Sequence, residues 1–256
     1  VAEYSVRIMV ESKEGRGATY NRGFQEAKGD YVAYLDSDAV APASWLKDAL
    51  RILGQNSSIA VVHFKSLAPP GSSYFQKCVD TLLSKRWGGA NGAVYKKNAL
   101  EKVGGFNRSL PYLQEDEVKI KLLEQGYTIQ VAREPVIQHS PRRNFTSYFI
   151  QCIEGGIGSL KLFLILRRPN FLAELLIRAL VAVLPFVAVI SLAFSSPPTW
   201  ILAVGTTIGV LLYTTHLWIS THPTYRSVKY VLPATFLMWI STLASLLGYI
   251  AGLFKT

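Results

Sequence analysis

Hydrophobic and polar positions divide the chain into two parts of different character. Up to about residue 170, short apolar runs alternate with polar and charged stretches, whereas no Asp or Glu occurs after Glu174. The segments 179–225 and 230–254 carry no Asp, Glu, Lys or Arg at all. This pattern predicts a water-exposed domain followed by apolar helices.

The first part alternates between patterns typical of strands and of helices. Strands are expected at 4–10, 31–35 and 59–64, and helices at 19–30 and 42–56. Gly29 and Gly54, near the ends of the two helices, are suited to terminating them. Strands that alternate with helices imply right-handed crossovers and a largely parallel sheet covered on both faces. We therefore expect an α/β fold in which ligands bind beyond the carboxyl ends of the strands.

The apolar second part predicts three membrane spans. The uncharged segment 179–225 is too long for one span of about 20 residues but suits two spans joined by a turn at 195–198. The expected spans are 174–194, 199–219 and 230–253. A buried helical hairpin in a soluble protein is the alternative, but lengths near that of a membrane span recur three times.

The positions of the basic residues predict the orientation in the membrane. Arg167, Arg168 and Arg178 precede the first expected span, Arg226 and Lys229 lie between the second and third, and the first connection is uncharged. The positive-inside rule then predicts a multi-pass integral membrane protein with its first part in the cytoplasm. The net charge of +10 comes without a zinc finger, an RNP motif or a basic stripe, so the expected partner is the lipid bilayer and not nucleic acid.

Two acids follow the apolar segment 31–35, at Asp36 and Asp38. Side chains two residues apart in an extended segment point the same way, so both carboxylates would face one spot at the mouth of a strand. Two hard oxygen donors suit Mg2+ or Mn2+, whose coordination shells are completed by waters and substrate phosphates. Alternatively, the two acids only make Asx-turns and cap a helix that starts near Pro42.

Two ordered blocks of sequence resemble family 2 glycosyltransferases with the GT-A fold. In residues 15–46 a glycine, Asn21 before a helix, an Ala-x-Gly-Asp stretch and an apolar strand precede Asp36 and Asp38. In residues 88–139 a Gly-rich strand, a basic pair, Gly-Gly-Phe, the acidic pair Glu115-Asp116 and a Gly-Tyr-x-Ile strand lead to His139. The resemblance implies a Rossmann-like GT-A domain that uses a nucleotide-diphosphate sugar.

The resemblance also implies roles for the acidic residues. Asp38 would hold the metal, and Asp36 would support the metal or the ribose. Asp116, with Glu115 beside it, would be the base that activates the acceptor hydroxyl, and in-line attack would invert the anomeric centre. Alternatively, Asp116 is only the N-cap of the helix that begins there.

Five further residues are candidates for binding the nucleotide sugar. His139 would reach the metal or the diphosphate, and Arg142 would hold phosphate. Asn21 belongs to the nucleotide-binding block. Trp87, beside Gly89, would form a stacking platform for the sugar. A satisfied histidine near the membrane and a core tryptophan remain alternatives for His139 and Trp87.

Some features depart from the family pattern. The family begins with a strand, a helix and a second strand, and none of these precedes Val1, so we expect the chain to lack part of the nucleotide pocket. Residues 1–143 would form the partial GT-A domain, 144–170 a connector of amphipathic interfacial helices broken near Gly155-Gly156, and 171–256 the membrane domain. The connector has no Gln-x-x-Arg-Trp, the signature of processive synthases.

Taken together, the sequence predicts a membrane-bound, inverting, non-processive glycosyltransferase that acts on a lipid-linked or membrane-proximal acceptor. A polyprenyl-phosphate sugar synthase is one alternative. The other is a catalytically incomplete protein that binds a sugar nucleotide without transferring the sugar.

Overall fold

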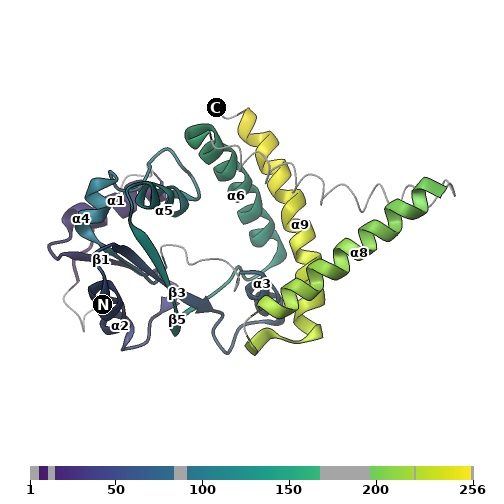
Figure 1. The fold of residues 1–256 in the computed structure, drawn as a ribbon, viewed down its shortest axis with the longest axis horizontal. Coiled ribbons are helices and arrows are strands. Elements are labelled where there is room, and N and C mark those ends of the chain that lie inside the picture. Colours follow the sequence, from purple (N-terminus) through teal and green to yellow (C-terminus); the bar gives the residue numbers. More distant parts are fainter. Residues whose placement is uncertain (1–5, 11–14, 84–90, 168–196, 222, 255–256) are drawn as a thin grey trace.

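A computed structural model of the chain shows an α/β domain beside a group of long helices (Figure 1). The predicted span 174–194, Trp87 and Gly89 lie outside the residues that the structure describes. The described residues are 6–10, 15–83, 91–167, 197–221 and 223–254.

The sheet of the α/β domain has five strands in the order β1-β4-β3-β5-β2. Only β3 and β5 pair in parallel, while β1–β4, β4–β3 and β5–β2 are antiparallel. The strands are β1 (Tyr31–Tyr34), β2 (Ala39–Val40), β3 (Ile59–Leu67), β4 (Ala93–Lys96) and β5 (Thr128–His139).

The prediction of a largely parallel sheet is therefore wrong. The crossover rule did give the correct direction for β1 and β3, which both run opposite to β4 and hence the same way as each other. They are not neighbours, however, because β4 lies between them. The order of strands and helices along the chain indicates the direction of each strand. It does not show that a strand from a later part of the sequence will lie between two earlier ones.

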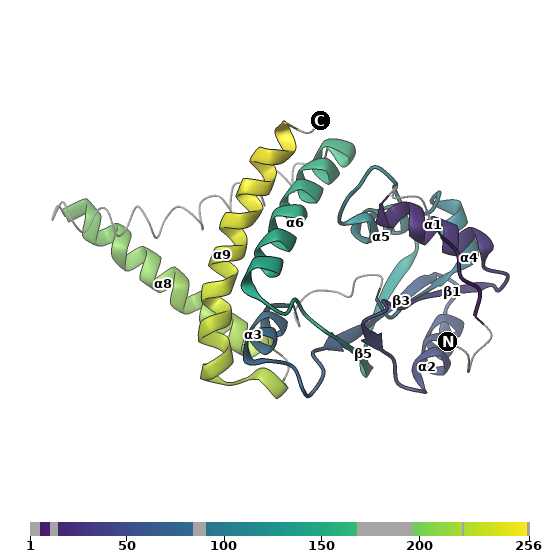
Figure 2. The same cartoon turned by 180° about the vertical axis from the view of Figure 1, so that it is seen from behind.

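Helices cover both faces of the sheet (Figure 2). Tyr95 and Val61 face the side covered by α1, α4 and α5, whereas their neighbours Val94 and Val62 face α2. This alternation is the two-residue period of a strand buried on both faces. The helices are α1 (Arg16–Glu26), α2 (Trp45–Gln55), α4 (Lys97–Lys102) and α5 (Gln114–Glu124).

The predicted elements match the structure unevenly. The helix expected at 19–30 begins earlier, at Arg16, and ends at Glu26. The strand expected at 4–10 is wrong over its described part, because residues 6–10 form no strand and are exposed, Val10 at 92%. An alternating pattern produces a strand only where another strand supplies hydrogen-bond partners for its backbone.

Two of the described helices are long and apolar enough to cross a membrane, α6 (Phe145–Leu166) and α9 (Val228–Leu253), whereas three spans are predicted, one of them outside the described residues. Only the predicted span 230–253 coincides with one of them. The span predicted at 199–219 falls on α8 (Pro197–Ser220), which is followed by the short 3-10 helix η1 (Pro223–Tyr225). The predicted break near Gly155 is also wrong, since α6 is continuous through it.

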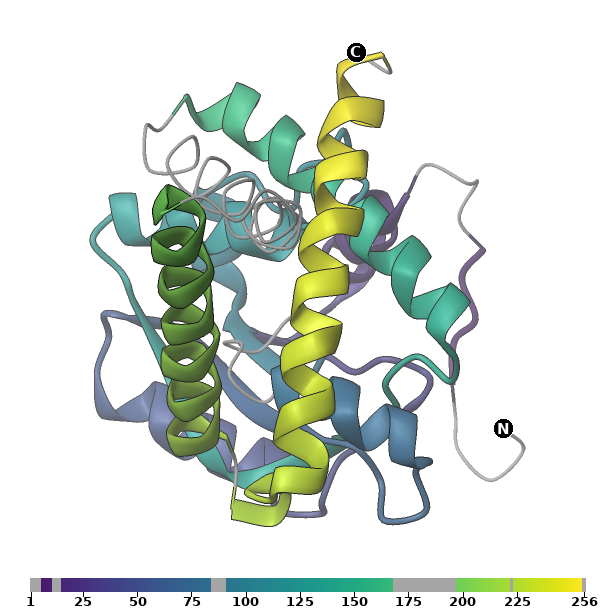
Figure 3. The same ribbon diagram turned by 90° about the vertical axis from the view of Figure 1, so that its right-hand side faces the viewer.

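α6 and α9 run in the same general direction and cross obliquely at close range (Figure 3). A Cβ atom added to Gly156 would collide with the carbonyl oxygen of Ser245, and one added to Gly248 would collide with the carbonyl oxygen of Ile153. The two glycines therefore let the two backbones touch, as small residues do between membrane helices. This packing favours a continuous α6 despite its paired glycines.

Replacement of Gly156 by Ala should destabilise the helix pair. The added methyl group has no room against the backbone of α9, so we expect a loss of about 1–3 kcal/mol and a lower melting temperature. Gly155→Ala is the matched control, because nothing lies within 4 Å of a Cβ atom at that position. Thermal unfolding of the whole chain in detergent would measure both variants, and equal melting temperatures would contradict the close crossing.

Candidate active site

Asp36 and Asp38 lie directly after β1, in a turn closed by a hydrogen bond from the Ala39 N–H to the Asp36 carbonyl (3.0 Å). The helix that follows begins at Trp45, and its N-cap residue, Ser44, makes no side-chain cap. Neither aspartate therefore caps that helix, which removes the capping alternative. Both carboxylates are partly exposed, at 41% for Asp36 and 58% for Asp38.

His139 reaches the same turn from the far end of β5. In the antiparallel pairing of β2 with β5, Ala39 lies opposite His139. The His139 Nε2 atom is 3.4 Å from Asp38 Oδ1 and 3.8 Å from Asp36 Oδ2. The predicted grouping of these three residues is thus present in the structure.

The three side chains have the geometry and chemistry to bind a divalent cation. One ligand atom from each lies within 4.8 Å of the other two. Carboxylate oxygens are preferred by Mg2+ and Mn2+, and imidazole is a common ligand of transition metals. The exposed carboxylates leave room for the waters or phosphates that would complete the shell of such an ion.

Asn91 is a site residue that the sequence reasoning missed. Its Oδ1 atom accepts a hydrogen bond from the Asp36 N–H (3.2 Å), and its side chain is buried. Its Nδ2 atom has no hydrogen-bond partner among the described residues. The Asn91-Gly92 dipeptide before β4 signals a turn, but no local pattern shows that this turn lies against Asp36.

Asp116 lies in the first turn of α5, with its carboxylate 3.1 Å from Lys119 Nζ. The N-cap of this helix is Leu113, which adopts a left-handed conformation and makes no side-chain cap. The alternative that Asp116 is the N-cap is therefore wrong. Its side chain is 46% exposed and lines a cleft.

Tyr20 lies near both acidic groups. Burial raises its pKa well above the usual tyrosine value, and the negative charges of Glu115 and Asp36 raise it further. Both carboxylates act on the pKa of the Tyr20 hydroxyl, so Glu115 in α5 and Asp36 at the end of β1 face the same part of the domain. The Tyr20 carbonyl also accepts a hydrogen bond from the Tyr34 hydroxyl (3.1 Å).

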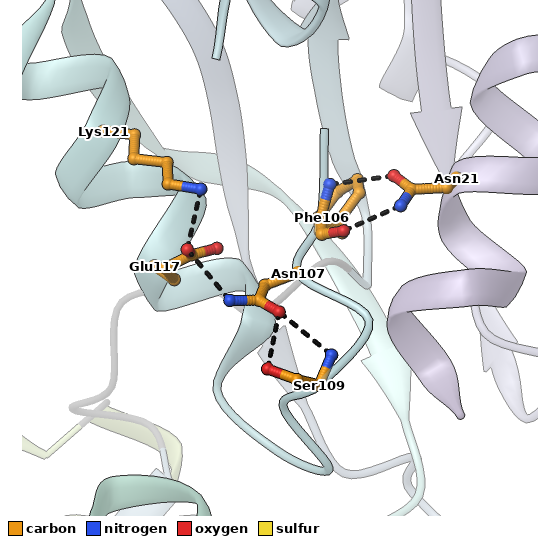
Figure 4. Close-up of polar contacts among 6 residues, drawn as sticks. All are labelled: Asn21, Phe106, Asn107, Ser109, Glu117 and Lys121. Atoms are coloured by element: carbon orange, nitrogen blue, oxygen red, sulfur yellow. Dashed lines mark hydrogen bonds and ion pairs between the residues drawn. The ribbon is translucent and has the colours of Figure 1, made fainter. Parts of the chain in front are cut away.

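Asn21, a predicted nucleotide-binding residue, is occupied by a structural contact (Figure 4). Its Nδ2 atom donates to the Phe106 carbonyl (2.7 Å) and its Oδ1 atom accepts from the Phe106 N–H (2.8 Å). Gly105 has a φ of +71°, and a Cβ atom there would collide with Asn21 Oδ1. The Asn of the first sequence block and the Gly-Gly-Phe of the second are thus two halves of one interaction.

Arg142 is exposed, three residues beyond His139. It lies in the segment that joins β5 to α6 and is open to solvent there. The structure therefore brings together Asp36, Asp38 and His139 and places Asp116 in the wall of a cleft. Arg142 is near the first group in sequence, and the structure gives no contact between them.

The cleft at Asp116 separates the α/β domain from the long helices. Its volume is about 1070 Å³, and its walls come from α5, α6 and α9. At the domain end are Asp116 and Lys119, and the remaining walls are mainly apolar. The Gln151 side chain, on α6, donates to the Tyr112 hydroxyl (2.9 Å) and so joins the two sides.

Comparison with known proteins identifies the family of the chain. The sequence model of glycosyl transferase family 2 matches residues 1–103, and that of glycosyl transferase family 21 matches residues 84–255, more than half of the chain. The chain therefore belongs to glycosyl transferase family 21, and the family 2 match over its N-terminal part confirms the predicted resemblance.

Individual relatives match the chain over different lengths. An uncharacterized glycosyltransferase of Haemophilus influenzae is 24% identical, over 52% of this chain and 50% of that protein. The UDP-forming cellulose synthase catalytic subunit of Komagataeibacter sucrofermentans is 22% identical, over 63% of this chain and 24% of that protein. The chain thus spans half or less of these relatives.

A solved structure shows the same fold. The mannosyltransferase PcManGT from Pyrobaculum calidifontis, solved in complex with GDP-Man and Mn2+, superposes with a TM-score of 0.59 at 18% identity. The match covers 94% of this chain and 67% of the mannosyltransferase. The mixed sheet with helices on both faces is thus a GT-A-like α/β fold.

Replacement of Asn21 by Ala should destabilise the domain. The change leaves a buried N–H and a buried carbonyl of Phe106 without partners, and we expect a loss of about 2–3 kcal/mol. Arg22→Ala is the matched control, because Arg22 is exposed and its one contact given among the described residues is a surface ion pair with Glu26 (3.4 Å). Thermal unfolding would distinguish the two, and an Asn21→Ala protein as stable as the control would contradict the structural role.

Proposed function

We propose that this protein transfers a sugar from a nucleotide-diphosphate sugar to an acceptor at the membrane. The observation that carries the proposal is the convergence of Asp36, Asp38 and His139 at one end of the sheet. A divalent cation held there, Mg2+ or Mn2+, would neutralise the charge that develops on the diphosphate leaving group. Membership of a glycosyltransferase family supports the same reaction class.

The residues around the cation site would hold the donor. Asp36 and Asp38 are fixed by the turn at Ala39, and Asn91 orients the backbone of Asp36. Arg142, exposed just beyond His139, is placed in the sequence to pair with phosphate oxygens. Trp87 and Gly89 stay proposed for the sugar. Since one relative is UDP-forming and the solved neighbour holds GDP-Man, we leave the base of the donor open.

Asp116 would accept the proton of the attacking hydroxyl. Its carboxylate is partly exposed at the end of the cleft, where an acceptor could reach it, and Lys119 holds it in place (3.1 Å). Glu115, the adjacent acid, would assist. Attack from the cleft side, opposite the diphosphate, would invert the anomeric centre.

The acceptor in this proposal is lipid-linked or lies at the membrane surface. The cleft runs from Asp116 to the candidate membrane helices α6 and α9, and its apolar walls suit an aliphatic chain. A lipid in this position would present its polar end to Asp116. The proposed transfer is a single one, because the sequence lacks the Gln-x-x-Arg-Trp of processive synthases.

The proposed location is an integral membrane protein with its catalytic domain in the cytoplasm. Arg226 lies just before α9, Lys229 lies in the first turn of α9, and Arg142 lies just before α6, so both helices begin on a basic side. The start of α6 at Phe145 supports a boundary near residue 143 between the catalytic domain and the segment 144–170.

Asp116→Asn tests the proposed chemistry. Removal of the base should lower sugar transfer by about 100- to 10,000-fold while Mn2+-dependent binding of UDP or GDP is retained. Asp38→Ala should instead abolish that binding. Glu101→Gln, an exposed acid on α4, is the control and should change neither. Calorimetry and a transfer assay would measure the two properties, and full transfer by Asp116→Asn would rule out Asp116 as the base.

A further inference from the structure

α3 (Tyr74–Leu83) is the helix that connects the candidate metal site to the long helices. It lies beside α9 and next to the ends of β3 and β5 (Figure 1). Its buried Cys78 and Val79 pack against Tyr148 of α6 and Leu237 of α9. The Tyr74 hydroxyl donates to the Lys229 carbonyl near the start of α9. The position of α3 is therefore set by the candidate membrane helices.

Gln76 makes three hydrogen bonds at the start of this helix. Its Oε1 atom accepts from the Ser73 N–H (3.0 Å), and its own N–H donates to Ser73 Oγ (3.2 Å), which is the reciprocal pattern of a capping box. Its Nε2 atom donates to the Pro141 carbonyl (2.9 Å) in a buried position. Helix capping requires only the first two hydrogen bonds. The third, to Pro141, ties α3 to the segment that follows β5.

Asp80, one turn further along α3, holds the neighbouring strand. Its side chain is 4% exposed, and Oδ2 accepts from the Ala68 N–H (2.7 Å) directly after β3. Burial raises its pKa to about 6, even though the Ala68 and Tyr225 hydrogen bonds oppose that rise. Burial of a carboxyl group costs free energy unless it is hydrogen-bonded. The Asp80 carboxyl group is hydrogen-bonded to the Ala68 N–H, which has this side chain as its acceptor.

The two contacts lie on either side of His139. Pro141, held by Gln76, comes two residues after it. Gln138, the residue before His139, pairs with Leu67 of β3. Ala68, the residue after Leu67, is held by Asp80. On its other side, β5 is paired only with the two-residue strand β2. Strand pairing alone therefore leaves the end of β5 weakly held, and α3 supplies the missing support.

We propose that Gln76 and Asp80 are positioning residues that hold His139 against Asp36 and Asp38, and so join the metal site to the α6–α9 pair. The proposal rests on the proposed function, because it requires a cation at that site. Groups that fix the backbone or ring of a metal ligand raise the affinity for the metal without touching it. A shift of α3 on the long helices would then be transmitted to the cation site.

The test is a titration of the whole chain in detergent with Mn2+ alone, followed by electron paramagnetic resonance. Gln76→Met keeps a similar length but cannot donate to Pro141, and we expect its affinity for Mn2+ to fall by about 10-fold. Ser73→Ala is the matched control, because each variant breaks the capping box but only Gln76→Met also loses the Pro141 bond. His139→Ala is the reference for a lost ligand.

Melting temperatures separate positioning from general stability. Weaker Mn2+ binding by Gln76→Met, with Ser73→Ala binding as the wild type does and a similar melting temperature for both variants, supports the proposal. Wild-type affinity in Gln76→Met overturns it, as does an equal loss in Ser73→Ala. A wild-type chain that binds no Mn2+, or a His139→Ala chain that binds it unchanged, overturns the metal site itself and with it the proposed function.

Discussion

The short antiparallel pairing between β2 and the end of β5 is the contact on which the candidate site depends. It sets His139 opposite Ala39, and Ala39 closes the turn that begins at Asp36. Without this pairing the two aspartates would still lie at the end of β1, but no strand contact would hold the His139 imidazole beside them. Two residues of strand thus convert a pair of surface acids into a group of three possible ligands.

So short a pairing cannot maintain the geometry by itself, and the surrounding structure shows how it is supported. Asn91 fixes the Asp36 backbone from just before β4, while α3 bonds to Pro141, two residues after His139, and to Ala68, at the end of the neighbouring strand β3. α3 packs in turn against α6 and α9. These two helices are held close together where they cross at Gly156 and Gly248. The candidate membrane helices and the site are therefore parts of one packing arrangement.

Two sequence motifs, Asn21 and Gly-Gly-Phe, have a structural role that their sequence context did not indicate. Asn21 and the Gly-Gly-Phe motif both look like parts of a binding site when read separately, yet they bond to each other and hold α1 against the loop before α5. The glycine that precedes Phe106 is needed because the Asn21 side chain occupies the space of a Cβ atom. A motif that resembles part of a binding site can thus serve the packing of the domain.

The sequence by itself determined the features that depend on neighbouring residues. These include the division into a charged and an apolar part, helices such as α2 and α5, and the two acids at the end of an apolar strand. Only the tertiary structure decided that β4 separates β1 from β3, that Asn91 lies against Asp36, and that α6 continues through its paired glycines. The reason is physical: periodicity reflects local hydrogen bonding and burial, whereas contacts between distant segments depend on how all the elements pack at once.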